Sequence, residues 1–264
     1  MPLYKTVALV LRRIPLGEKD KIVTLFSRDL GKLRAVAKGA RKPTSKLSGA
    51  SEPLLLLRAS IAEGSSLDVL SEAEVREAFP KLKSDYGRFL RATYACELLE
   101  KVMEERDPHP ESFDLLLSTL YILQHAIQPD TALHAFELQL LAQIGYEPQL
   151  STCIRCDNPF DTDYPPVGYS PSRGGALCIP CTEFLGVEAM PCNATTILLL
   201  ERLTSLTNAK ALAALELPEE ALTEINRLIR SHLRYRVERE IKSLGMLDAH
   251  RLTCLSEEPH TSAI

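Results

Sequence analysis

Residues 1–72 carry short runs in which apolar and polar residues alternate, and this period of two is typical of β-strands. Five such runs occur, at residues 7–11, 21–27, 32–38, 52–62 and 66–71. Five short strands in a segment of this length predict a small barrel, either an OB-fold or the closely similar SH3-like barrel. The period also predicts that the basic residues of the third run share its outer side: Lys32, Arg34 and Lys38.

From about residue 75 the apolar positions recur every three or four residues, which predicts helices at residues 81–106, 111–126, 130–144, 193–208 and 218–244. Residues 150–186 lose this period, and the polar residues 248–264 are expected to fray. The predicted fold class is therefore α+β and multidomain. It comprises a five-stranded OB-fold barrel at residues 1–76, a helical domain at 77–150 and 187–247, an inserted segment at 151–186 and a C-terminal tail at 248–264.

Charge is distributed unevenly along the chain. Residues 1–50 hold twelve Lys or Arg and three acidic residues, a net charge of +9. Residues 51–264 hold the other 19 basic and 32 acidic residues, a net charge of −13. A basic module joined to an acidic body attracts a polyanion to one part of the molecule, so nucleic acid is the first partner to consider.

Apolar runs and cysteines bear on the compartment. No apolar run approaches the roughly 18 residues that span a bilayer, so we expect no membrane segment. The N-terminal apolar strip also lacks the length and the cleavage site of a signal peptide. The chain has seven cysteines, and a reducing cytoplasm with a metal site accounts for them better than a disulfide framework.

Four of the cysteines form two Cys-x2-Cys pairs, Cys153 with Cys156 and Cys178 with Cys181, and residues 157–177 separate the pairs. Each pair turns two thiolates toward one point, and two pairs supply the tetrahedral sulfur site that Zn²⁺ accepts. We therefore expect one structural Zn²⁺ per chain, with four unmetallated thiols or a redox pair as the alternatives. The other three cysteines are expected to be ordinary thiols: Cys96, Cys192 and Cys254.

A basic track is predicted on the third strand and the loop that follows it. Its members are Lys32, Arg34, Lys38, Arg41, Lys42 and Lys46, extended by Arg12 and Arg13. No acidic residue lies between Lys32 and Lys46, so a phosphate backbone could follow this track. The alternative is a solvated edge strand, which lysines protect against pairing with another chain.

Aromatic residues are scarce in this module, since residues 1–72 contain only Tyr4 and Phe26. OB-folds that hold single strands tightly use several rings for stacking. The sequence therefore predicts binding of single- and double-stranded DNA through phosphates, with little sequence preference. If about five phosphates are neutralised, the log–log salt slope on single strands is expected to be roughly −3.5.

Three arginines are spaced for one face of the last long helix: Arg227, Arg230 and Arg234. They are candidates for docking an acidic partner segment or for a second DNA contact. The alternative is a solvated face with i,i+4 ion pairs, Arg234 with Glu238 and Arg236 with Glu240.

Enzyme motifs are missing from the sequence. It contains no phosphate loop, no dinucleotide-binding glycine motif and no nucleophile elbow, and its six histidines are scattered. We therefore expect the protein not to be an enzyme.

In their order along the chain, several stretches resemble the RecO family of bacterial DNA repair and recombination proteins. They are residues 16–20, 22–26, 31–32, 36–42, 45–46, 136–141, 145–146, 148 and 228–243, with both cysteine pairs and Gly174-Gly175. The resemblance implies an OB-fold, a helical domain and a zinc insertion. It also implies zinc at the four cysteines and DNA contacts at Lys38, Arg41, Lys42 and Lys46.

The resemblance implies a function as well. Such a protein anneals complementary strands and, with RecR, helps to load RecA onto DNA coated by the single-strand binding protein SSB, whose tail would dock on the helical domain. It would be cytoplasmic and associated with the nucleoid. The rival hypotheses are a zinc-ribbon RNA-binding or transcription accessory factor, a protein-docking adaptor, and an enzyme with an unrecognised site.

Overall fold

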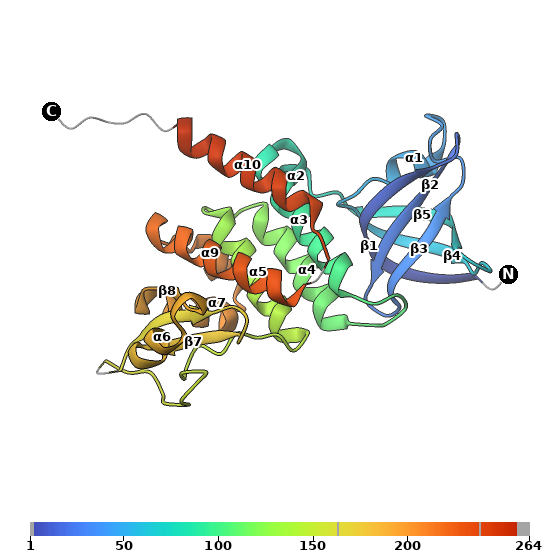
Figure 1. The fold of residues 1–264 in the computed structure, drawn as a ribbon. Coiled ribbons are helices and arrows are strands. Elements are labelled where there is room, and N and C mark those ends of the chain that lie inside the picture. The colour runs from blue at the N-terminus through green and yellow to red at the C-terminus, as the bar shows by residue number, and fades with distance from the viewer. Residues whose placement is uncertain (1–2, 163, 238, 258–264) are drawn as a thin grey trace. The chain divides into compact units, whose positions relative to one another are not determined.

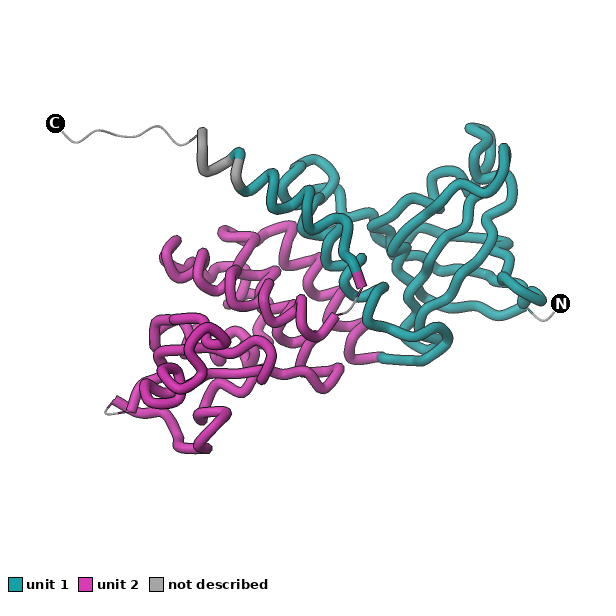
Figure 2. The backbone as a smooth tube through the Cα atoms, in the orientation of Figure 1, with its two compact units in different colours: residues 1–109, 240–264 teal, residues 110–239 magenta. Residues whose placement is uncertain are grey.

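The computed structural model describes residues 3–162, 164–237 and 239–257. The chain divides into two compact units (Figure 2), and each is described by itself. Unit 1 comprises Met1–His109 and Glu240–Ile264, and unit 2 comprises Pro110–Arg239. The domain boundaries expected from the sequence stay a prediction.

The N-terminal part of unit 1 is a closed barrel of five strands (Figure 1). They are β1 (Leu3–Leu16), β2 (Asp20–Ser27), β3 (Gly31–Ala37), β4 (Leu56–Ala62) and β5 (Asp68–Glu77). The strand order is β1-β2-β3-β5-β4, β1 pairs with β4 to close the barrel, and only β3 and β5 run parallel. The predicted OB-fold is confirmed, with the short helix α1 (Lys46–Ala50) between β3 and β4.

Small and branched apolar side chains fill the barrel, because alternate residues of each strand point inward. On β3 these are Leu33, Ala35 and Ala37, as the alternation predicts. The expectation that Lys32 is an exposed member of the basic track is wrong, because this residue is only 7% exposed. Its Nζ donates to the carbonyl of Glu100 at 2.8 Å and to that of Met103. A chain segment distant in sequence covers this position, which a local pattern cannot show.

The first helical segment of unit 1 is interrupted where the sequence predicts one continuous helix. The single helix expected at residues 81–106 is two, α2 (Pro80–Ser84) and α3 (Tyr86–Val102). Asp85 separates them, because its side chain caps α3 by accepting the N–H of Arg88 at 2.9 Å.

The prediction of one long helix at residues 218–244 is also wrong. The structure has two helices here: α9 (Glu219–Arg236), which belongs to unit 2, and α10 (Lys242–Glu257), which packs on α3 within unit 1. Glu97 of α3 accepts the N–H groups of Lys242 and Ser243 at 3.0 and 2.8 Å, which satisfies the first turn of α10. Residues 248–257, expected to fray, continue this helix, and residues 258–264 lie outside the described residues.

Unit 2 is a helical bundle with a small sheet inserted. The helices are α4 (Pro110–Leu123), α5 (Pro129–Gln143), α7 (Ala194–Ser205), α8 (Ala209–Ala214) and α9. Helix α5 is buried along most of its length, so it forms the centre of the bundle, and Gly145 ends it with a positive φ of 79°.

The inserted segment of unit 2 has its own short elements. They are β6 (Pro166–Ser170), β7 (Gly175–Cys178), α6 (Ile179–Leu185), the 3₁₀ turn η1 (Gly186–Glu188) and β8 (Met190–Pro191), with sheet order β7-β6-β8. Among the described residues, none of the helices has the length and apolarity that a bilayer crossing requires.

Asp68 joins three segments of unit 1, and its replacement tests that connection. The carboxylate, 2% exposed, accepts the Tyr4 hydroxyl of β1 at 2.6 Å and the Arg106 guanidinium at 2.8 and 2.9 Å. We expect Asp68→Ala to lower the free energy of unfolding by about 2–3 kcal/mol, because it removes charged hydrogen bonds and leaves the half-buried Tyr4 hydroxyl without its acceptor. Urea denaturation measures this loss.

The matched control is Glu74→Ala on the same strand, because Glu74 is exposed and pairs only with Arg76 among the described residues. We expect a change within about 0.5 kcal/mol there. Equal effects of the two variants would contradict this role of Asp68.

Candidate metal centre and nucleic-acid surface

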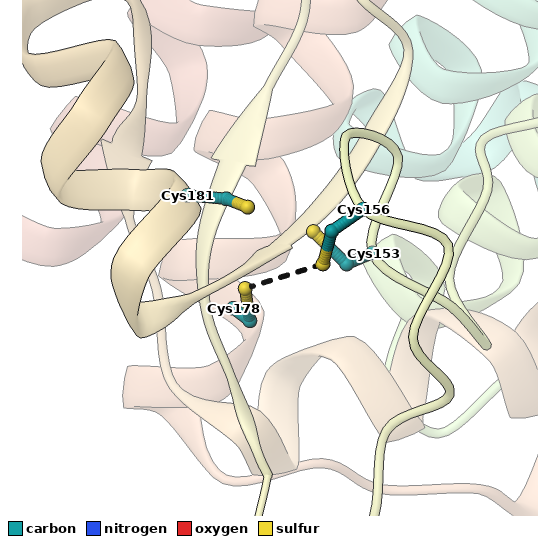
Figure 3. A group of neighbouring side chains, drawn as sticks. All are labelled: Cys153, Cys156, Cys178 and Cys181. Atoms are coloured by element: carbon teal, nitrogen blue, oxygen red, sulfur yellow. Dashed lines mark hydrogen bonds between the residues drawn. The ribbon is translucent and has the colours of Figure 1, made fainter.

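The four cysteines of the two pairs lie together in the inserted segment. Cys153 and Cys156 come from one irregular loop, Cys178 ends β7, and Cys181 lies in the first turn of α6 (Figure 3). All four sulfur atoms lie within 4.8 Å of one another, and the cluster is buried except at Cys156. The predicted pairing of the two knuckles is therefore confirmed as a common site.

The sulfur geometry fits a tetrahedral zinc ion. Zn–S bonds of about 2.3 Å place neighbouring sulfurs about 3.8 Å apart. The Sγ atoms of Cys156 and Cys178 are 3.8 Å apart. A set of four thiolates leaves no position for water, so Zn²⁺ held here would be structural, and it would join a loop, a strand and a helix that share only a small apolar cluster.

The thiols of the cluster differ in how readily they ionise. Burial raises the pKa of the Cys181 thiol, and hydrogen bonds with the other three cysteines raise it further. The hydrogen bond from Arg155 lowers it, and the balance of these effects is a pKa of about 12. The opposite direction holds for Cys153, where backbone N–H groups outweigh burial and lower the pKa to about 6. A divalent cation held among the four sulfurs would stabilise the thiolate form of each.

Two residues that contact the cysteines were not predicted from the sequence. The Tyr164 hydroxyl donates to the Cys178 sulfur at 3.0 Å, and the Arg155 guanidinium donates to the Cys181 sulfur at 3.7 Å. Both would offset the negative charge of a tetrathiolate. In the sequence, only the closeness of these two residues to the cysteine pairs could have indicated such a contact.

The remaining cysteines lie apart from this cluster. Cys96 is buried in α3 and Cys192 is half-buried, and burial raises the pKa of each thiol to about 12. Neither belongs to the metal-binding group. The side chain of Cys254 lies outside the described residues.

The predicted basic track is only partly exposed as a continuous surface. The segment from the end of β3 to the first residue of α1, called the basic loop here, carries four exposed members: Lys38, Arg41, Lys42 and Lys46. Among the described residues, the three lysines have neither an ion-pair nor a hydrogen-bond partner for their side chains.

The other exposed members of the track are paired with acids distant in sequence. Arg13 contacts Glu52 at 2.7 Å, Arg12 contacts Glu100 at 3.7 Å, and Arg34 contacts Glu105 at 3.9 Å. The last two distances are long and exposed pairs are weak, so these arginines keep part of their attraction for phosphate. Counting charges between residues 32 and 46 could not reveal these partners.

Stacking rings are absent from the described surface of the barrel. Phe26 is fully buried, and Tyr4 is half-buried with its hydroxyl bonded to Asp68. Both aromatic residues of this region therefore serve the fold. Any polyanion would meet ammonium and guanidinium groups here instead of aromatic faces.

The three arginines of α9 do not form one exposed face. Arg227 is held by the Pro191 carbonyl and Glu224, whereas the side chain of Arg230 is 12% exposed and lies 3.7 Å from the buried Glu137. Arg234 is exposed, and its expected partner Glu238 lies outside the described residues. Arg236, expected to pair with Glu240, instead donates to the Ser172 carbonyl at 3.4 Å.

The fold and the metal centre together define the class: an OB-fold protein with a helical second unit that carries a four-cysteine insertion. The chain matches the family model "Recombination protein O N terminal" over residues 1–79 and "Recombination protein O C terminal" over residues 83–245.

Similar curated proteins bear the name DNA repair protein RecO. The one from Dehalococcoides mccartyi strain BAV1 is 35% identical over 96% of this chain and 98% of its own length. Those from Symbiobacterium thermophilum and Pelotomaculum thermopropionicum are 34% and 36% identical, over 95% and 94% of this chain and 99% and 94% of their own lengths. The chain belongs to the RecO family of DNA repair proteins.

The metal centre predicts one zinc per chain in elemental analysis of the purified protein. We expect Cys178→Ser/Cys181→Ser to reduce the zinc content to near zero and to lower the melting temperature, because the apolar core of this segment is small. Cys192→Ser is the matched control and should retain the metal. Equal zinc in both variants would exclude these sulfurs as the ligands.

Proposed function

We propose that this RecO-family protein binds single- and double-stranded DNA through the basic loop of its barrel and anneals complementary strands without a chemical step. The observation that carries the proposal is a set of three exposed lysines, Lys38 and Lys42 in the loop after β3 and Lys46 at the start of α1. They lie near Arg41 in the sequence and have no partner among the described residues. Positive side chains without aromatic rings favour contact with the sugar-phosphate backbone over contact with bases.

This surface suits annealing for a physical reason. Two complementary strands repel each other through their phosphates, and ammonium groups reduce that repulsion. Bases held on aromatic faces would have to leave them before pairing. A surface of lysines leaves the base edges available, so neutralisation and pairing can proceed together.

The family membership supports a wider role as a mediator. The protein would act with RecR to load RecA onto DNA coated by SSB, in the cytoplasm at the nucleoid. The SSB tail would dock on unit 2, where Arg227 and Arg234 are the exposed members of the three candidate arginines and Arg227 is already held by Glu224 and the Pro191 carbonyl. Zn²⁺ would be structural.

A zinc-ribbon RNA-binding factor and a protein-docking adaptor are the competing functions. Competition between RNA and DNA of equal length separates the first from our proposal. An adaptor would keep its function when the lysines of the loop are replaced, which the next variant tests directly.

Replacement of the three lysines tests the proposed surface. We expect Lys38→Gln/Lys42→Gln/Lys46→Gln to make the log–log salt slope for a single-stranded oligonucleotide about 2 units less steep, because each lost phosphate contact removes about 0.7. Fluorescence anisotropy across a salt series measures this slope.

The control removes three charges elsewhere, as Lys5→Gln/Arg58→Gln/Lys210→Gln, all at exposed positions. Its slope should stay near that of the unmodified protein. If both triple variants behaved alike, net charge alone would explain binding and the proposed surface would be wrong.

Mediator activity is tested with the same two triple variants. We expect the loop variant to slow annealing of complementary oligonucleotides coated by SSB and to reduce RecA loading with RecR, whereas the control keeps both activities. Loss of DNA binding with full RecA loading would contradict the link between this surface and the mediator role.

A further inference from the structure

The turn between β1 and β2 lies against the basic loop. Two hydrogen bonds from backbone N–H groups connect these segments. The Arg41 N–H donates to the Lys19 carbonyl at 3.0 Å, and the Gly39 N–H donates to the Asp20 carboxylate at 2.7 Å. Gly17 and Gly39 have φ values of 56° and 67°, which favour glycine, so both segments bend sharply where they meet. They project at the end of the barrel beside α1 (Figure 1).

Arg41 and Lys19 differ in what their side chains do. The Arg41 guanidinium donates to the Gly17 carbonyl, so this side chain folds back along the β1–β2 turn. The Lys19 side chain is exposed and, among the described residues, has no partner. Its ammonium group is therefore available to a ligand of the adjoining loop.

We infer that Lys19 is a further phosphate contact of the barrel and that Arg41 is a positioning residue that holds the Lys19 turn against the basic loop. The inference rests on the proposed DNA binding. It extends the phosphate-binding surface from one loop to two, which lie side by side although the whole of β2 and β3 separates them in the sequence.

Two acidic residues lie at the turn, and one of them gives a second prediction for DNA binding. Asp20 is engaged with Gly39, but Glu18 is exposed beside Lys19 and has no partner among the described residues. A phosphate bound at Lys19 would be repelled by the Glu18 carboxylate. Removing the two charges should therefore have opposite effects on affinity if the turn faces DNA.

The experiment measures salt-dependent binding of a fluorescent single-stranded oligonucleotide to the full-length protein. We expect Lys19→Gln to make the log–log slope about 0.7 less steep, as for one lost phosphate contact. Glu18→Gln should tighten binding at low salt. Lys5→Gln is the control, because Lys5 is an exposed lysine near the other end of β1 and should leave the slope unchanged.

A double-mutant cycle tests the role of Arg41. If Arg41 positions the turn, Lys19→Gln should have a smaller effect on affinity in the Arg41→Ala background than alone, whereas independent phosphate contacts would be additive. Arg41→Lys, which retains a donor for the Gly17 carbonyl, should restore the full effect of Lys19→Gln.

The outcomes separate this inference from the proposed function. An unchanged slope for Lys19→Gln and unchanged low-salt affinity for Glu18→Gln, with binding weakened in the Lys38/Lys42/Lys46 variant, would overturn the inference alone. Unchanged binding in all of these variants would overturn the proposed function as well. Additive effects in the cycle would overturn the positioning role of Arg41.

Discussion

Pairing between charges that are distant in sequence decides which positive groups of the barrel can meet a polyanion. Lys32 is bound by carbonyls at the end of α3, and Arg13 is bound by Glu52. Lys21, buried nearby, is held by Ser51 and the same glutamate. The strong positive charge at the start of the chain is thus partly internal. Its exposed part includes four lysines on the β1–β2 turn and on the segment from the end of β3 to the start of α1: Lys19, Lys38, Lys42 and Lys46.

The same internal use of charge gives the barrel its attachment within unit 1. Arg106 bridges to Asp68 on β5, and its N–H donates to the Lys32 carbonyl on β3 at 2.9 Å. Barrel strands are therefore tied to the segment that leaves α3. These contacts hold the backbone of β3, the strand that leads into the basic loop, although the lysine side chains of that loop keep no partner among the described residues.

Much of this architecture was predictable, and the failures share one cause. Alternation identified all five strands, and the spacing of the cysteines identified the four-cysteine cluster, because both signals are local. Lys32, the paired arginines and the start of α10 depended on residues far along the chain, such as Glu97 for α10. The regular apolar spacing at residues 225–241 favoured one continuous helix, and only the tertiary partner at Glu97 reveals where the second helix begins.

The route of the chain also has a consequence for biosynthesis. The barrel and α3 leave the ribosome first, yet α10, which completes their unit, is the last described element to emerge. All of unit 2 is synthesised in between, so one face of α3 stays uncovered in the nascent chain until Pro110–Arg239 has been added. Translation thereby imposes a delay on the maturation of the first unit, which cannot be complete before the residues of α10 have been added.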